Sequence, residues 1–98
     1  MNLTAEQFTK AMRALSEPNR VEILRRVGAN ACQQGVTCSS VLDQMGISQS
    51  TFSHHVSELK EAGLLIGQAE GRLVRLTVNE ELLVQVQNAI ANLTTVKN

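Results

Sequence analysis

The chain has 98 residues, and its composition is 43% hydrophobic but only 2% aromatic, with no Trp and no Tyr. A chain of this length is sufficient for one domain and too short for two, so we expect residues 1–98 to form one unit whose core is built from the aliphatic side chains of packed helices. Its nine basic and nine acidic residues cancel, which excludes net charge as a general argument for a nucleic-acid partner.

The first two predicted helices lie on either side of Ser16. Thr4, with Gln7 three residues later, has the pattern of a capping box and predicts the start of the first helix. Ser16 ends that helix and is expected to cap a second one, which has Pro18 in its first turn and ends at Gly28. Both helices carry apolar residues at helical spacing: Phe8, Ala11, Met12 and Leu15 in the first, and Val21, Leu24 and Val27 in the second.

A pair of helices joined by a short turn follows a predicted loop. Residues 28–35 are small and polar with a glycine at each end, which is typical of a loop. A third helix is expected from near Thr37 to Gly46, and a fourth from its cap Ser48 to Gly63. Their inward positions are Val41, Leu42 and Met45 in the third helix, and Phe52, Val56 and Leu59 in the fourth. So short a connection predicts a helix-turn-helix, the motif that places its second helix in the major groove of DNA.

After the fourth helix the apolar period changes from that of a helix to that of a strand. Residues 64–66 are apolar and residues 72–78 alternate, so residues 67–71 are predicted to be the loop of a β-hairpin. Asn79 is expected to cap a last helix with more apolar positions than one helix can bury alone, so this helix needs a partner. The expected fold is mainly α with a small β-hairpin wing (α+β), a winged helix-turn-helix in the order α-α-α-α-β-β-α.

The outer face of the fourth helix is the candidate DNA-binding surface. It carries short hydroxyls and one imidazole, no acidic residue lies between Ile47 and Ser57, and the amide of Gln49 suits an adenine edge. The backbone N–H groups at the start of the helix suit a phosphate oxygen. The candidates for contact with double-stranded DNA are Ser48, Gln49, Ser50, Thr51, Ser53 and His54 on this helix, with Arg72 and Arg75 on the wing. The alternative is an ordinary solvated helix face with ordinary surface charges on the hairpin.

The neighbouring histidine, His55, is interpreted differently from His54. His55 lies about 60° from Phe52 on a helical wheel, so we expect a semi-buried packing residue.

The same region argues against an enzyme. Ser53, His54 and His55 project in divergent directions and cannot converge on a substrate, and the chain has neither a glycine-rich phosphate loop nor paired carboxylates. We therefore expect no catalytic activity and no cofactor. The remaining alternative is a winged helix that binds other proteins, which would lack salt-sensitive, sequence-selective DNA binding.

The sequence predicts a cytoplasmic protein, and the spacing of its two cysteines suggests a hypothetical redox switch. No apolar run reaches the roughly 18 residues of a membrane span, and no signal-peptide pattern begins the chain, so we expect cytoplasmic localisation without a membrane partner. Cys38 should lie at the start of the third helix, where the helix dipole lowers a thiol pKa, and Cys32 precedes it by six residues. A disulfide between them would tether the loop to the helix. The alternative is that both are small buried space-fillers.

Three segments together resemble the ArsR/SmtB-type winged-helix repressors. Residues 14–24, ALSEPNRVEIL, are similar to the family's A-L-S-D-P-T-R-L-x-I-L, and residues 46–56, GISQSTFSHHV, are similar to G-L-S-Q-P-T-V-S-R-H-L. Residues 61–65, EAGLL, followed by 70–72, EGR, resemble the end of the recognition helix and its wing. The resemblance implies a homodimer formed by the first and last helices, which binds a pseudo-palindromic operator and represses transcription until an inducer weakens it. The residues expected at the dimer interface are Phe8, Leu82, Leu83, Val86, Ile90 and Leu93.

The chain departs from that family at its metal sites. Metal-sensing members carry C-V-C at the start of the third helix, where this chain has Thr37, Cys38 and Ser39, so both ligand positions are hydroxyls. The last helix contains no histidine and no aspartate. Two thiols without a well-placed imidazole cannot complete a tetrahedral site in one subunit, so we expect no metal site, and the inducer is unknown.

Overall fold

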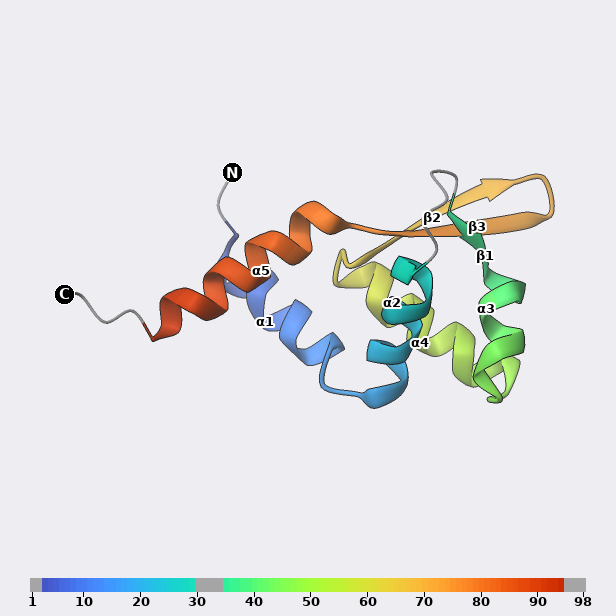
Figure 1. The fold of residues 1–98 in the computed structure, drawn as a ribbon, viewed down its shortest axis with the longest axis horizontal. Helices are drawn as coiled ribbons and strands as arrows, with labels where there is room; N and C mark the ends of the chain where they lie inside the picture. The colour runs from blue at the N-terminus through green and yellow to red at the C-terminus, as the bar shows by residue number, and fades with distance from the viewer. Residues whose placement is uncertain (1–2, 30–34, 95–98) are drawn as a thin grey trace.

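The computed structural model describes residues 3–29 and 35–94, and within them the molecule is elongated, with extents of 52 × 25 × 21 Å (Figure 1). The elements follow the chain in this order: α1 (Ala5–Ala14), α2 (Pro18–Ala29), β1 (Val36–Thr37), α3 (Cys38–Met45), α4 (Gln49–Glu61), β2 (Leu65–Glu70), β3 (Leu73–Val78) and α5 (Glu80–Leu93). The predicted class, mainly helical with a small antiparallel wing, is confirmed. The wing differs from the prediction in one strand and in the position of its turn.

The additional strand is β1, which joins the edge of the hairpin. Val36 pairs with Leu76 and Thr37 with Arg75, so the sheet has the antiparallel order β1-β3-β2. Gly35 makes this approach possible: it has a φ of +84°, and a Cβ there would lie 2.4 Å from the carbonyl oxygen of Leu76. A strand of two residues has no alternating pattern, so the sequence indicated only a loop followed by a helix.

The predicted hairpin loop at residues 67–71 is wrong for most of its length. Strand β2 continues through these residues to Glu70, which pairs with Leu73, so the turn consists of Gly71 and Arg72 alone. Gly71 has a φ of +63°, as tight hairpin turns require. Gly67 serves a different purpose inside the strand. A Cβ at this position would lie 3.1 Å from the Nζ atom of Lys60, so the glycine leaves room for the lysine side chain.

The junction between α1 and α2 also differs from the expectation. The hydroxyl of Ser16 donates to the carbonyl of Arg13 at 2.6 Å and thereby closes α1, so Ser16 does not cap α2. Glu17 takes that role: its carbonyl accepts from the N–H groups of Arg20 and Val21, and its carboxylate accepts from the N–H of Asn19 at 3.1 Å. A carboxylate can cap as well as a hydroxyl, and its position directly before Pro18 decides between the two.

The other predicted helix starts are confirmed. Thr4 and Gln7 form a capping box, and the side chains of Thr37, Ser48 and Asn79 each accept a backbone N–H at the start of α3, α4 and α5. Gly46 ends α3 in the left-handed conformation, with a φ of 68°. The helix-turn-helix is therefore formed where the sequence predicted it.

The core lies between α2, α3, α4 and the inner face of the sheet. Its most deeply buried side chains are aliphatic, as the composition predicted: Ile23, Val41, Leu59, Leu64 and Leu76. Helices α1 and α5 lie side by side at one end of the molecule, and the hairpin extends to the other end (Figure 1). Of the α5 residues, only Val86 is fully buried, so this helix is attached to the core mainly by its first half.

Candidate nucleic-acid interface

The first turn of α4 is held by hydroxyl groups and carries no carboxylate. The Oγ of Ser48 accepts from the N–H of Thr51 at 3.2 Å, donates to its Oγ1 at 2.9 Å, and lies 3.4 Å from the Oγ of Ser50. Ser48 and Thr51 therefore act first as the helix cap. Because no acidic side chain opposes the positive end of the helix dipole, this exposed terminus is suited to an anion such as a phosphate.

The outer face of α4 is exposed, as the helical wheel predicted. Gln49, Ser50, Ser53 and His54 are all exposed, whereas the opposite side of the helix is buried. The ring of His54 lies 5.8 Å from that of His55, centroid to centroid. His55 itself is only 7% exposed, which confirms that it is a packing residue rather than a surface residue.

A groove of about 380 Å³ runs between the start of α3, the helix α4 and the strand β3. On the α4 side it is lined by a stripe at helical spacing: Gln49, Ser53, Ser57 and Lys60. Arg72 and Val74 line it from the wing, and Cys38 and Leu42 from α3. None of the described residues that line this groove carries a carboxylate. The groove therefore combines neutral hydrogen-bonding groups with positive charge.

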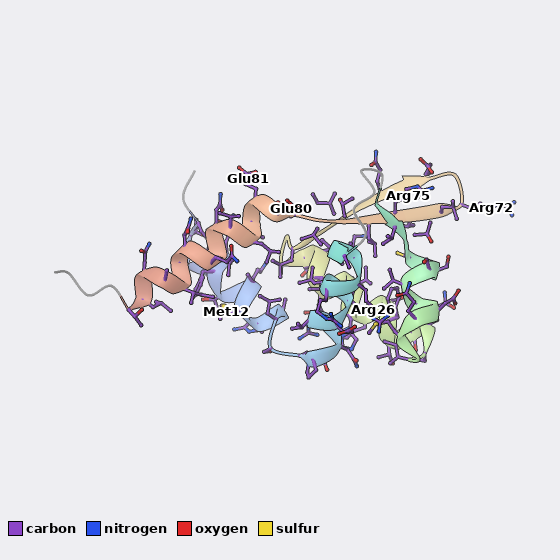
Figure 2. All side chains as sticks on the ribbon, viewed as in Figure 1. Met12, Arg26, Arg72, Arg75, Glu80 and Glu81 are labelled. Carbon is purple, nitrogen blue, oxygen red and sulfur yellow. The ribbon has the colours of Figure 1, made fainter. Side chains whose placement is uncertain are left out.

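The two wing arginines lie in different environments, although the sequence grouped them together. Arg72 is exposed at the turn and projects beyond the tip of the hairpin (Figure 2). Arg75 is only 25% exposed, and its Nε donates to Oε1 of Glu70 at 2.9 Å. Because Arg75 immediately precedes the inward-facing Leu76, it lies on the other face of the sheet. The structure therefore brings Arg72 to the groove with α4 and keeps Arg75 away from it.

The sequence reasoning missed Lys60. This residue lies in the last turn of α4, lines the groove and extends its side chain over Gly67. In the described part of the chain its ammonium group has no hydrogen-bond or ion-pair partner. The missing signal was spacing: Lys60 follows Ser53 by seven residues, which returns it to the same face after two turns.

Cys38 lies at the start of α3, as predicted, but its environment differs from the expectation. Burial raises the pKa of the Cys38 thiol, and the positive charge of Lys60 offsets only part of that effect. The prediction that the helix terminus would lower this pKa is therefore wrong, because desolvation dominates. Cys32, its predicted partner, lies outside the described residues. Among residues 3–29 and 35–94, no three His, Cys, Asp or Glu side chains are grouped as a metal site requires.

The residues expected at a dimer interface occupy two different environments. Phe8, Leu82 and Leu83 are half-buried against the core, and Val86 is 2% exposed, so Val86 is already covered by its own chain. Ile90 and Leu93 are 43% and 70% exposed. The α5 positions 83, 86, 90 and 93 form one helical stripe, and the chain covers its first half but leaves the second half uncovered.

Comparison with known proteins agrees with this architecture. A family profile described as a helix-turn-helix domain matches residues 15–68. The HTH-type transcriptional regulator CmtR of Mycobacterium tuberculosis is 31% identical over 87 residues, covering 85% of this chain and 70% of the relative. The chain belongs to the helix-turn-helix transcriptional regulators.

Solved structures of ArsR-type proteins share the fold. An ArsR-like transcriptional regulator from Rhodococcus sp. RHA1 has a TM-score of 0.77 at 22% identity, covering 90% of this chain and 79% of that one. A homodimeric winged helix-turn-helix DNA-binding domain from Mycobacterium bovis has a TM-score of 0.69 at 20% identity, covering 95% and 88%. In the described residues of this chain, no helix is long and apolar enough to cross a membrane.

Proposed function

We propose that this ArsR-type protein is a homodimeric, sequence-specific DNA-binding repressor of transcription that acts in the cytoplasm. The observation that carries the proposal is the groove beside α4. The described residues that line this groove carry no carboxylate and include two cations that have no hydrogen-bond or ion-pair partner among them, Lys60 from the helix and Arg72 from the wing. Gln49 and Ser53 read base edges, while the start of α4, Lys60 and Arg72 contact backbone phosphates.

A second copy of this chain is the partner proposed for α5. The stripe that packs on the core in the first half of α5 continues through Ile90 and Leu93 without a cover, and such apolar residues gain free energy when they are removed from water. The relative from Mycobacterium bovis, described as a homodimer, has the same fold. Because a two-fold dimer presents two copies of α4, the operator is pseudo-palindromic.

We propose no enzymatic activity, no cofactor and no metal site for this protein. Control of DNA binding by thiol oxidation is a separate hypothesis, since the raised pKa of Cys38 reduces its thiolate fraction at neutral pH. Equal DNA affinity of the reduced and the peroxide-treated protein would remove this hypothesis. Loss of affinity on oxidation that a Cys38→Ser variant does not show would support it.

The experiment that tests the proposal is fluorescence anisotropy with DNA from upstream of the protein's own gene. We expect tight binding that survives excess non-specific DNA and weakens steeply between two salt concentrations. Titration of tiled upstream fragments locates the operator and shows whether two half-sites are present. If no fragment binds selectively at either salt concentration, the proposal fails, and a protein-binding winged helix becomes the better interpretation.

A further inference from the structure

The side of α4 that faces the protein contains one ionisable residue with an unusual environment. His55 is the buried polar side chain of the described chain, and it lies among the aliphatic residues that hold α4 to the core. Removing an imidazole from water is costly unless both ring nitrogens find partners. Both do, and the partners come from outside α4.

The two partners fix the orientation of the imidazole ring. The Nδ1 atom lies 3.4 Å from Nη1 of Arg20, and the Nε2 atom lies 3.3 Å from Oε2 of Glu17. A guanidinium group can only donate, so Nδ1 accepts, and a neutral ring then carries its proton on Nε2, directed toward the carboxylate. One edge of the ring accepts and the other donates, and the two contacts define how α4 is rotated about its own axis.

The same partners are anchored to the two preceding helices. Arg20 donates from Nε to the carbonyl of Ala14 at 2.7 Å and from Nη2 to that of Arg13 at 3.4 Å, at the end of α1. Glu17 is held at the start of α2 by the N–H of Asn19. A continuous chain of polar contacts therefore runs from the end of α1, through the start of α2, to the middle of α4.

We propose that Glu17, Arg20 and His55, the His55 cluster, position the recognition helix relative to the subunit interface. This inference rests on the proposed function, because it assigns a role to the geometry between α1, which lies beside α5 in the proposed interface, and α4, which reads DNA. Aliphatic packing alone is non-directional and tolerates small rotations, whereas hydrogen bonds weaken steeply when their angles change. The cluster thereby sets the separation and orientation of the two α4 helices in the dimer.

The contact between the two histidine rings connects this cluster to the exposed face. His54, a candidate DNA contact, lies against His55 at a ring-centroid distance of 5.8 Å. A change in the rotation of α4 that moves His55 out of its two contacts also redirects His54 and Ser53. The cluster consequently affects selective binding, which needs correct base contacts, more than binding to phosphates.

The test uses the full-length protein and separates positioning from simple stability. His55→Leu introduces an apolar side chain of similar size and removes both contacts, whereas His55→Gln offers one acceptor and one donor. Glu17→Ala removes the acceptor that faces the Nε2–H of His55 at a half-exposed site, so it keeps the test available should His55→Leu fail to fold. The matched control is Glu22→Ala, which removes the carboxylate contacts to Arg25 and Arg26 on the surface of α2.

Three readouts decide the outcome. We expect His55→Leu and Glu17→Ala to lose about tenfold in the ratio of specific to non-specific DNA affinity, with an unchanged salt slope. These two variants should also discriminate less than the wild type does between the operator and derivatives that have one base pair added or removed between the half-sites. His55→Gln should recover most of the affinity ratio, and Glu22→Ala should keep it.

The cluster also has a DNA-independent signature. In the free protein, amide chemical shifts of residues 49–54 should move in His55→Leu and Glu17→Ala and return toward wild-type values in His55→Gln. An unchanged affinity ratio, or unchanged shifts in both variants, overturns the positioning role. If the wild type binds no DNA selectively, the proposed function fails, and the shift measurement still decides whether the cluster orients α4.

Discussion

The two ends of this molecule differ in how much of a candidate binding surface one chain forms by itself. At the wing end, the Ser48 side chain caps the start of α4 and the hairpin closes with a two-residue turn. The groove beside α4 is formed within one chain. At the other end, α5 buries half of its apolar stripe and leaves Ile90 and Leu93 exposed. The proposed DNA-reading surface thus needs no second subunit for its shape, whereas Ile90 and Leu93 at the end formed by α1 and α5 have no cover within the described chain. Substitutions at the two ends should therefore have separable consequences.

The largest effect is expected at the incomplete end. Ile90→Asp places a charge where each subunit would bury an isoleucine worth roughly 1.5–3 kcal/mol, and a two-fold interface contains that residue twice. We expect the dimer dissociation constant to rise by at least about 100-fold, as measured by sedimentation equilibrium. Val21→Asp is the matched control, because Val21 is equally exposed at 42% but lies on α2. A wild-type protein that sediments as a monomer would contradict the interface.

At the complete end, the amide of Gln49 should contribute most to sequence selectivity. A bidentate contact to a base is worth about 1–3 kcal/mol, so Gln49→Ala should weaken operator binding by about tenfold or more. Its affinity for unrelated DNA and its subunit association should not change. Gln68→Ala provides the control, because Gln68 pairs with Arg75 on the sheet face away from the groove. Equal losses on operator and unrelated DNA would show that Gln49 does not read bases.

A smaller and sequence-independent effect is expected from Lys60. If its ammonium group contacts one phosphate, Lys60→Ala should reduce the slope of log affinity against log salt by about 0.9 for each subunit bound. Specificity should be unchanged, since phosphates carry no sequence information. Lys10→Ala, which removes an exposed cation from α1, should leave the slope as it is in the wild type. An unaltered slope in Lys60→Ala would show that the ammonium group of Lys60 contacts no DNA phosphate.

The smallest effect concerns Cys38, at the edge of the groove. Burial raises the pKa of this thiol and Lys60 lowers it in part, so removal of Lys60 should raise the pKa further. In a Cys32→Ser background, the rate of alkylation by iodoacetamide should rise with pH around a midpoint above that of free cysteine. The midpoint should move to higher pH in Lys60→Ala. A midpoint below that of free cysteine would revive the expectation of a reactive thiolate.

The sequence predicted what depends on neighbouring residues. The capping box at Thr4, the cap at Ser48 and the left-handed glycine at Gly46 are local patterns, and all three are present in the structure. The periodic apolar faces likewise identified the exposed side of α4. These features depend on residues a few positions apart, which is the range over which helix geometry constrains the chain.

The features that could not be predicted depend on contacts between distant segments. Strand β1 forms where Gly35 allows the backbone to approach Leu76, and Gly67 is a strand residue because it pairs with Leu76 of β3. His55 was expected to be semi-buried, but its contacts with Glu17 and Arg20 cross more than thirty positions of the chain. Periodicity in one helix carries no information about which polar groups another helix brings to it.

The two-residue turn at the tip of the wing has a consequence for how this surface can vary in length. Side chains on a strand alternate between faces, so one extra residue in each strand would turn the arginine at the tip away from the groove. Two extra residues in each strand would return it to the same face, about 7 Å farther along the hairpin. The reach of the arginine beyond α4 can therefore change only in steps of about 7 Å, slightly more than the roughly 6 Å width of the DNA minor groove. Hairpin length is thus a stepwise determinant of the geometry of the proposed operator.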